Sequence, residues 1–367
     1  MEDWLLYLAV AWFAGTIILS IWQTWRYISL ANLKKDYPLL ASDQLPPLSL
    51  IIACHNEAEN LSQNLEHWLQ LDYPDWEIIL INDFSTDQTW ELMQAAAEKN
   101  ARIQIINRSK GEGPGKKQAL STAIAQAQHQ NLVFCDADCR PLSKDWLRYI
   151  GSSFSQGKEL ILGYGKLEGN GAIQGLVDFE TVRTALSFWH YAYRGSAYMG
   201  VGRNIAYTKR LFEQANGFDA HLDLRSGDDD LFVHAVAEGA NIEILRDPNS
   251  FTVSQGPESY RAWIRQKGRH YSTAWRYKFK YQLSLGLEGS LVLLFWLLLG
   301  FALVLSPLVS LALLFSRMSV QLSLSQHQEM FAKAKNNLYW PLWEILYVLS
   351  TFVLHIKNLF ISNKREW

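Results

Sequence analysis

The stretch Val133-Phe134-Cys135-Asp136-Ala137-Asp138-Cys139-Arg140-Pro141 is an apolar run that ends in two carboxylates one residue apart. A buried strand that carries acids at its carboxyl end places them at the edge of an open sheet, where α/β folds bind ligands. Carboxylate oxygens suit Mg²⁺ or Mn²⁺, cations that bridge the phosphates of nucleotides. Taken alone, the stretch is better explained as an ordinary strand followed by a polar turn, because Asp-x-Asp pairs are common.

The composition indicates a chain that meets two different solvents. Of its 367 residues, 49% are hydrophobic, yet the mean hydropathy is near neutral at −0.07. The apolar residues concentrate in three blocks, Trp4–Trp25, Leu287–Phe315 and Leu338–Ile361, whereas the middle has the pattern of a soluble α/β domain. A formal net charge of −2 gives no reason to expect nucleic acid as a partner.

Three cysteines, Cys54, Cys135 and Cys139, lie on or beside predicted strands. An odd number of cysteines in such positions favours reduced thiols in a cytosolic domain over a disulfide framework. No Cys or His pairs in the sequence have the spacing of zinc ligands, so a zinc site is not expected.

Residues 1–28 are predicted to form a transmembrane anchor, and residues 29–46 a linker. Trp4–Trp25 carries no charge and is long enough to cross about 30 Å of hydrocarbon as a helix. Acids precede this segment, and positive charges follow it at Arg26, Lys34 and Lys35. The positive-inside rule therefore places the amino terminus outside and the next domain in the cytoplasm, at the inner (plasma) membrane of a cell.

Acids follow the ends of two predicted strands. The first, Leu48–Cys54, leads through a turn with Glu57 into a helix pattern, and the second, Glu77–Ile81, is followed by Asp83. A strand, a polar turn and a helix form the first half of a βαβ unit, whose turn contacts nucleotides in such folds. Glu57 is explained equally well as a favourable charge in the first turn of its helix. Asp83 lies where a carboxylate can accept from the imide N–H of a base.

A third predicted strand, Ile103–Asn107, leads into a segment rich in glycine and lysine that includes Gly115 and Lys116 and precedes a helix. Such a segment before a helix amino terminus can bind phosphate. It is not a Walker P-loop, because the glycine spacing differs and no Ser or Thr follows the lysine. Without the neighbouring motifs, a surface loop with solvated lysines is the better explanation.

Taken in order, these four strand ends resemble family 2 glycosyltransferases, including the poly-N-acetylglucosamine, cellulose and hyaluronan synthase-like enzymes. The resemblance implies an α/β class, with a GT-A (Rossmann-like, mostly parallel sheet) catalytic domain over residues 47–256 and flanking transmembrane and interfacial helices. It further implies roles for the matching residues: Glu57 and Asp83 contact the nucleoside, Lys116 lies near the diphosphate, Asp136 lies near the ribose or the metal, and Asp138 holds the metal. Asp83 stands alone where many members have two acids.

The acceptor half carries two further motifs. Tyr198–Tyr207 is similar to the glycine-rich stretch that these enzymes place beneath the sugar, which assigns Gly202 and Asn204 to the acceptor and diphosphate side. Ser226–Phe232 resembles the third acidic motif of the family and puts Asp228 in the place of the catalytic base. A rival interpretation takes the acids there as a solvated helix start that favours the helix dipole.

Residues 266–270 resemble the QxxRW box of processive members, with His270 where tryptophan is usual. The resemblance assigns Gln266, Arg269 and His270 to the acceptor and diphosphate side. Because a smaller, titratable ring replaces an aromatic platform, repeated and single sugar addition both stay open.

The remainder is predicted to face a membrane. Residues 257–283 alternate basic with aromatic side chains, as interfacial helices do. Residues 286–316 are predicted to form a tight transmembrane hairpin divided at Pro307, and residues 317–337 an amphipathic link. Residues 338–362 contain ionisable side chains, which leaves both a transmembrane and an interfacial helix open.

The expected reaction is an inverting transfer, dependent on Mg²⁺ or Mn²⁺, from a nucleotide sugar, expected to be UDP-linked, to a membrane-associated glycan or lipid. Polysaccharide synthesis with export or co-polymerase subunits is one form of it. A second form adds a single sugar to a lipid, as ceramide glucosyltransferase-like relatives do, and His270 keeps it open. A non-catalytic, sugar-nucleotide-binding subunit is disfavoured, because both the metal acids and Asp228 are present.

Overall fold

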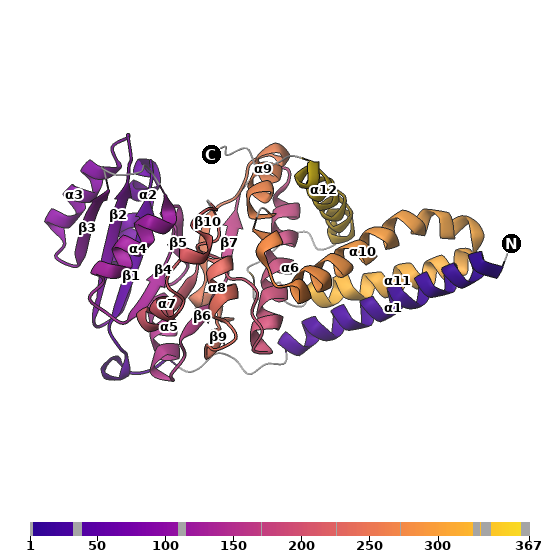
Figure 1. The fold of residues 1–367 in the computed structure, drawn as a ribbon, viewed down its shortest axis with the longest axis horizontal. Helices are drawn as coiled ribbons and strands as arrows, with labels where there is room; N and C mark the ends of the chain where they lie inside the picture. Colours follow the sequence, from indigo (N-terminus) through magenta and orange to yellow (C-terminus); the bar gives the residue numbers. More distant parts are fainter. Residues whose placement is uncertain are drawn as a thin grey trace. The chain divides into compact units, whose positions relative to one another are not determined.

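The computed structural model describes residues 3–31, 39–108, 115–169, 171–224, 226–271, 273–325, 331 and 339–360. The chain forms two compact units (Figure 1). The sheet unit comprises Lys35–Gly169 and Ser187–Gly256, and the helical unit comprises Met1–Lys34, Asn170–Leu186 and Pro257–Trp367. Helix α6 (Gln174–Tyr193) contributes residues to both.

A seven-stranded sheet forms the core of the sheet unit. Its strands lie in the order β3 (Ile103–Arg108), β2 (Trp76–Asp83), β1 (Leu48–Cys54), β4 (Asn131–Phe134), β8 (Ile205–Thr208), β6 (Leu160–Leu162) and β9 (Ile242–Ile244). The first four are mutually parallel, and β8 runs antiparallel to both of its neighbours. Because parallel strands end on the same side of a sheet, the carboxyl ends of β1, β2, β3 and β4 lie at one edge.

Helices cover the sheet, and a smaller sheet adjoins it. Strand β2 is buried along its whole length, the pattern of a parallel strand covered on both faces. Trp68 and Trp146, both fully buried, pack into the same core. The helices are α2 (Ala58–Leu69), α3 (Thr89–Lys99), α4 (Lys116–Gln126), α5 (Trp146–Ser155), α7 (Lys209–Gln214) and α8 (Asp230–Val236), with short 3-10 turns η1 (Ser42–Gln44), η2 (Asp219–His221) and η3 (Pro248–Ser250). The smaller sheet has the order β5 (Cys139–Pro141), β10 (Thr252–Gln255) and β7 (Gly165–Glu168).

The predicted α/β class with a mostly parallel sheet is confirmed. One local detail differs from the expectation of an apolar strand that ends in the acids. Strand β4 already stops at Phe134, and a turn follows in which the Cys139 N–H donates to the Asp136 carbonyl at 3.0 Å. Asp136 and Asp138 therefore lie on a turn that links the large sheet to β5 of the small one.

The helical unit is built from long helices. Its elements are α1 (Asp3–Ala31), α9 (Tyr260–Tyr271), η4 (Ala274–Arg276), α10 (Phe279–Leu305), α11 (Pro307–Ser325) and α12 (Trp340–Phe360). Helices α1, α10 and α11 lie side by side (Figure 1). Pro307 begins α11, where its missing N–H costs no hydrogen bond. Residues 32–38 of the predicted linker, and residues 326–330 and 332–337 of the predicted amphipathic link, lie outside the described residues.

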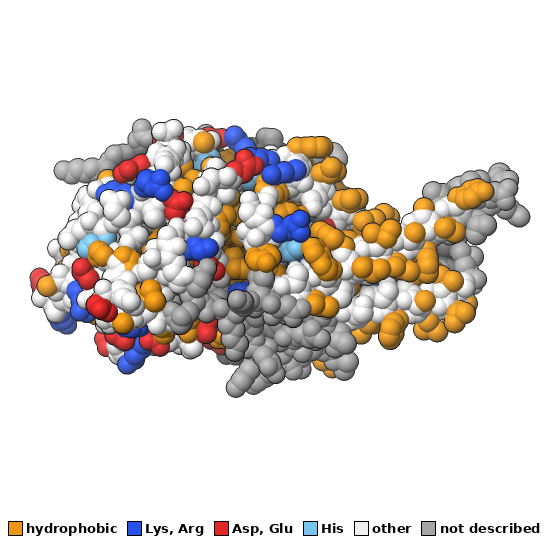
Figure 2. Space-filling model, turned by 90° about the horizontal axis from the view of Figure 1, so that it is seen from below, with side chains coloured by type: hydrophobic (Ala, Val, Ile, Leu, Met, Phe, Trp, Pro, Cys, Tyr) orange, Lys and Arg blue, Asp and Glu red, His pale blue; other side chains and the backbone are white. Residues whose placement is uncertain are grey.

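Among the described helices, α10 alone is long and apolar enough to cross a membrane, over Phe279–Val304. The apolar part of α11, Pro307–Gln321, is shorter. Exposed apolar side chains cover the surface of α1, α10 and α11 (Figure 2), among them Ile18, Ile21, Leu294, Leu297, Leu308 and Phe315. A surface of this composition favours contact with an apolar medium.

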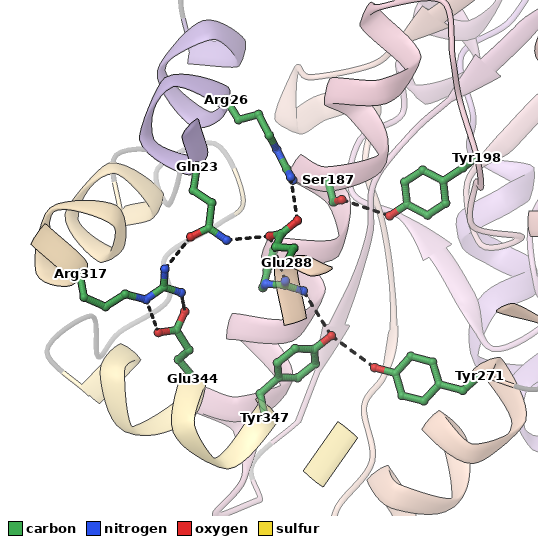
Figure 3. Close-up of polar contacts among 10 residues, drawn as sticks. Gln23, Arg26, Ser187, Tyr198, Tyr271, Glu288, Arg317, Glu344 and Tyr347 are labelled. Carbon is green, nitrogen blue, oxygen red and sulfur yellow. Dashed lines mark hydrogen bonds and ion pairs between the residues drawn. The ribbon is translucent and has the colours of Figure 1, made fainter. Parts of the chain in front are cut away.

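A buried polar network, here called the helix network, joins the helices of this unit (Figure 3). Glu288 on α10 accepts from Gln23 at 2.7 Å, from Arg26 at 2.9 Å and from Arg183 at 3.1 Å. Glu344 on α12 accepts from Arg317 Nε at 2.8 Å and from Trp296 at 3.0 Å. The Gln23 amide links the two halves, because its oxygen accepts from Arg317. Arg183 and Tyr271 also contact the Tyr347 hydroxyl at 3.3 Å each.

Candidate active site

Helix α2 holds the turn that carries Asp136 and Asp138. The Asn64 amide donates to the Ala137 carbonyl at 2.9 Å, and the Trp68 indole donates to the Cys139 carbonyl at 3.0 Å. Both donors are buried, so the turn is anchored through its backbone and its carboxylates are left for other contacts.

The two carboxylates fit a divalent cation. Ligand atoms of Asp136, Asp138 and Cys139 all lie within 4.8 Å of one another. The Cys139 thiol donates to Asp138 Oδ1 at 3.1 Å. Burial, together with the charge of Asp136, raises the pKa of Asp138. A divalent cation relieves such repulsion between carboxylates, and their oxygens are ligands that Mg²⁺ and Mn²⁺ prefer.

Lys116, at the start of α4, joins this turn to the acids before α8. Its Nζ atom lies 2.8 Å from Asp136 Oδ1 and 2.8 Å from Asp228 Oδ2. Burial disfavours the charged lysine, but the nearby carboxylates outweigh burial and raise the pKa of Lys116 well above its usual value. In return, although burial opposes ionisation, the ammonium lowers the pKa of Asp136. The sequence predicts Lys116 near a diphosphate; in the structure it bridges two acids.

Asp229 connects the acidic loop to the glycine-rich segment. Its Oδ2 accepts from the Gly202 N–H at 2.7 Å, and its Oδ1 accepts from the Asp230 N–H at 2.7 Å. Burial and the charges of Asp228 and Asp230 raise the pKa of Asp229 to about 7. Gly202 is thereby held against Asp228 and Asp229, so the glycine-rich segment and the acidic loop meet.

One cavity brings several of these predicted residues together. It is lined by apolar side chains of β1, β4 and β8 and by polar groups of Lys116, Asp136, Gly202, Asp228 and Asp229. The carboxylates and the Lys116 ammonium therefore lie next to apolar side chains, at the edge where the parallel strands end. Such a site can bind a charged ligand and exchange a proton with it.

Asp83 and Glu57 lie in the turns after β2 and β1. Asp83 forms an ion pair with Arg108 and accepts from the Gly115 N–H at 2.7 Å. Burial raises the pKa of Asp83, against the effect of these two contacts. The Arg108 guanidinium lies 5.5 Å from the ring centre of Phe84, whose φ of 59° is left-handed. Asp83 is therefore already paired within the protein.

Glu57 lies in the turn before α2 and interacts electrostatically with the Asp-x-Asp turn. Its Oε2 accepts from the Asn60 amide at 2.6 Å. Burial raises the pKa of Glu57, and the charges of Asp138 and Asp136 add to this rise. The charges of the Asp-x-Asp turn thus act on Glu57, and its contact with the nucleoside stays a prediction.

The four remaining predicted residues have other surroundings. Asn204 is buried, and its amide contacts Trp146, the Tyr164 carbonyl and the Ser250 carbonyl at 2.8 to 3.1 Å, so its contacts are structural. Gln266, Arg269 and His270 lie on α9 in the helical unit. The intervening Lys267 is buried and pairs with Glu180 at 2.7 Å, which fixes α9 to α6 within that unit.

Sequence reasoning missed several residues that shape the site. Asn64 and Trp68 bear no catalytic chemistry, and only their place on the helix after β1 gave a signal. Arg108 lies at the end of β3 beside Asp83, and the strand pairing that brings them together is not visible in the sequence. Asp229 binds the Gly202 N–H, and the run of three acids does not show which of them reaches the glycine-rich segment.

Comparisons with known proteins agree with this geometry. Residues 49–165 match the family described as Glycosyl transferase family 2, and residues 132–360 match Glycosyl transferase family group 2. The chain is 27% identical over 234 residues to a probable glycosyltransferase, YdaM, of Bacillus subtilis, covering 62% of this chain and 54% of that protein. It is 33% identical over 132 residues to poly-beta-1,6-N-acetyl-D-glucosamine synthase of Staphylococcus aureus, covering 36% of this chain and 30% of that enzyme. The chain thus matches about half the length of these relatives, or less.

A solved structure has the same fold. The mannosyltransferase PcManGT of Pyrobaculum calidifontis, in complex with GDP-Man and Mn²⁺, superposes with a TM-score of 0.63 at 20% identity, over 97% of this chain and 99% of that one. This likeness supports a GT-A fold. Since the second family match alone extends over more than half of the chain, the protein belongs to the family 2 glycosyltransferases.

Proposed function

We propose that the protein transfers a sugar, with inversion, from a UDP-linked nucleotide sugar to a hydroxyl group of a membrane-associated glycan or lipid, using Mg²⁺ or Mn²⁺. The convergence of Asp136 and Asp228 on one ammonium supports this most strongly. It brings Asp136, one of the two proposed metal acids, and the proposed base to one cavity. The mannosyltransferase of similar fold binds a nucleotide sugar and Mn²⁺, ligands of the same classes.

The proposed reaction is a single displacement. The acceptor oxygen attacks the anomeric carbon while the bond from that carbon to the diphosphate breaks, and the acceptor proton passes to the Asp228 carboxylate. Asp136 and Asp138 would hold the cation, which supplies Lewis-acid stabilisation of the charge on the diphosphate. Gly202 lies beside these acids and carries no side chain, and we assign it to the acceptor and diphosphate side. A covalent glycosyl-enzyme, as in retaining glycosidases, is not required.

On the donor side, we assign Glu57 and Asp83 to the nucleoside and Lys116 to the diphosphate. Because Asp83 is paired with Arg108, base binding there requires that this ion pair open or that Asp83 act through Arg108. On the acceptor side, we assign Gln266, Arg269 and His270. Asn204 is expected on the same side, and because its amide is buried and hydrogen-bonded within the protein, we assign it a supporting role there.

Single addition of a sugar to a lipid is the second candidate. The observation in its favour is the exposed His270 at the position where processive members carry tryptophan. For either acceptor we propose a multi-pass protein of the plasma membrane with a cytoplasmic sheet unit, and export or co-polymerase subunits as partners if the product is a polymer. The apolar surface of α1, α10 and α11 supports this location.

Calorimetry tests the donor and the metal. Purified protein should bind UDP in the presence of Mn²⁺, and EDTA or Asp138→Asn should weaken binding strongly, since both remove the cation that bridges protein and diphosphate. Tight binding of UDP without metal, or a clear preference for GDP, would contradict the proposal. Product analysis with UDP- and GDP-sugars and native lipid extract then identifies the sugar and acceptor.

Cysteine labelling tests the topology. The three native cysteines are buried, so the background reaction should be low. In intact cells, Asp3→Cys should react with an impermeant thiol reagent, whereas Gln156→Cys, exposed in the sheet unit, should not. The reverse pattern would place the sheet unit outside the cell.

A further inference from the structure

Lys116 has a position that its motif did not suggest. Its Nζ atom lies 2.8 Å from both Asp136 Oδ1 and Asp228 Oδ2, so a single ammonium joins an acid of the proposed metal site to the proposed base. The side chains of Lys116 and Asp136 are 38% and 32% exposed, so solutes can reach this ion pair. The contact is therefore accessible, unlike a purely structural ion pair of the core.

The glycine-rich segment packs against this ammonium. A Cβ atom at Gly202 would lie 3.5 Å from Lys116 Nζ and 3.4 Å from Asp229 Oδ2, which are ordinary contact distances. The Gly202 N–H also donates to Asp229 at 2.7 Å. Backbone, acids and ammonium thus form one packed cluster, and the ammonium has a defined place in it.

A divalent cation bound to Asp136 would compete with the Lys116 ammonium for this carboxylate. The cation and the Lys116 ammonium would be like charges on the same carboxylate group, and like charges repel strongly where water is partly excluded. Metal binding therefore requires the ammonium to give up Asp136. A nucleoside diphosphate brings enough negative charge for the metal and the ammonium together, which removes the conflict.

We propose that Lys116 is a resident counter-cation for Asp136, so that the free protein binds Mg²⁺ or Mn²⁺ weakly and the metal enters with the diphosphate of the donor. The inference rests on the proposed metal-dependent function. Lys116 is in this sense a positioning residue: its contact with Asp228 holds the proposed base in place while Asp136 exchanges the ammonium for the metal.

Mn²⁺ affinity provides the test, measured on the full-length protein in detergent by electron paramagnetic resonance of free Mn²⁺. Without nucleotide, Lys116→Met should bind Mn²⁺ more tightly than wild type by about tenfold or more, the size of effect that a neighbouring charge has on proton affinity. With UDP the order should reverse, because the variant lacks a charge for the diphosphate. Lys116→Arg keeps the charge and should bind Mn²⁺ as weakly as wild type.

Two controls show where the signal comes from. Lys99→Met, on the exposed side of α3, should leave Mn²⁺ affinity unchanged, and Asp138→Asn should remove binding with and without UDP. Equal affinity of wild type and Lys116→Met without nucleotide would overturn the inference and leave the proposed function standing, provided that UDP promotes Mn²⁺ binding. Failure of wild type to bind Mn²⁺ even with UDP would overturn both. If Lys116→Met does not fold, Lys116→Gln is compared with Lys116→Arg by the same criteria.

Discussion

The cluster around Lys116 and the helix network both place acids beside bases, but they differ in how completely the acids are satisfied. In the helix network, every carboxylate oxygen of Glu288 and Glu344 accepts from a side chain, and both acids are 3% exposed. In the site, Asp136 remains 32% exposed and Asp228 11% exposed, and both share one ammonium. A saturated network has no capacity left for a ligand, whereas an accessible cluster rich in acids has.

The physical reason lies in desolvation. Buried ions are tolerated when each is paired and hydrogen-bonded, and removing one partner then leaves an uncompensated charge. In the site the acids are held close enough to raise the pKa of Asp229 and Asp138, chiefly because they are buried beside like charges. Binding a cation or a proton relieves the repulsion between these buried carboxylates, so the site favours such ligands.

The largest effect is expected in the site, from Asp228→Asn. The substitution keeps the size of the side chain and leaves Asp136 and Asp138 in place, so the KM for the donor should stay near wild type while kcat falls. General-base catalysis is typically worth about 10²–10⁴-fold, and a loss of that order is expected in steady-state assays. A loss of less than about tenfold would exclude Asp228 as the base.

The neighbouring acid Asp230 provides a matched control for Asp228. It carries the same charge and accepts from the Leu231 N–H at 2.7 Å in the first turn of α8. Asp230→Asn should retain most of the activity. An equal loss in both variants would revive the interpretation of these acids as a charged helix start.

Breaking the helix network should instead change stability. Glu344→Leu leaves the buried Arg317 guanidinium without its carboxylate, and removing one partner of a buried pair typically costs about 3–5 kcal/mol. Thermal unfolding in detergent measures the loss, and the affinity for Mn²⁺ and UDP of the folded variant should stay unchanged. The double variant Arg317→Met/Glu344→Leu removes both charges and should recover much of the stability. If Glu344→Leu unfolds at the same temperature as wild type, the Arg317–Glu344 ion pair does not contribute to stability as expected.

The smallest effect concerns the pH dependence of stability. The pKa of Asp229, about 7, is above the usual value of an aspartate in an unfolded chain. Between about pH 4 and pH 7 the folded protein therefore binds more protons than the unfolded chain does. The free energy of unfolding therefore decreases as pH rises through this range. Asp229→Asn retains an acceptor for the Gly202 N–H and removes the titration, so its Tm should fall less than that of wild type between pH 5 and pH 7.5. The exposed Asp219→Asn should keep the wild-type slope, and an unchanged slope in Asp229→Asn would count against the raised pKa.

The sequence by itself was sufficient for the α/β class, the strands that lead to the edge, the Asp-x-Asp pair and the family. These features are local: continuous apolar runs specify buried parallel strands, and the polar residues that follow them must lie at the strand ends. The apolar blocks were likewise visible as composition, because a long apolar segment needs no partner in the sequence to be recognised.

Only the tertiary structure decided which polar groups meet. Lys116 next to Asp228, Asp229 on the Gly202 N–H, and Arg108 on Asp83 are contacts between loops whose side-chain directions depend on packing. The helix network was equally hidden, because Gln23, Glu288 and Arg317 are isolated polar residues on three different helices, α1, α10 and α11. Periodicity reports which side of an element is buried, whereas the pairing of charges depends on distances across elements, and those distances exist only in the folded chain.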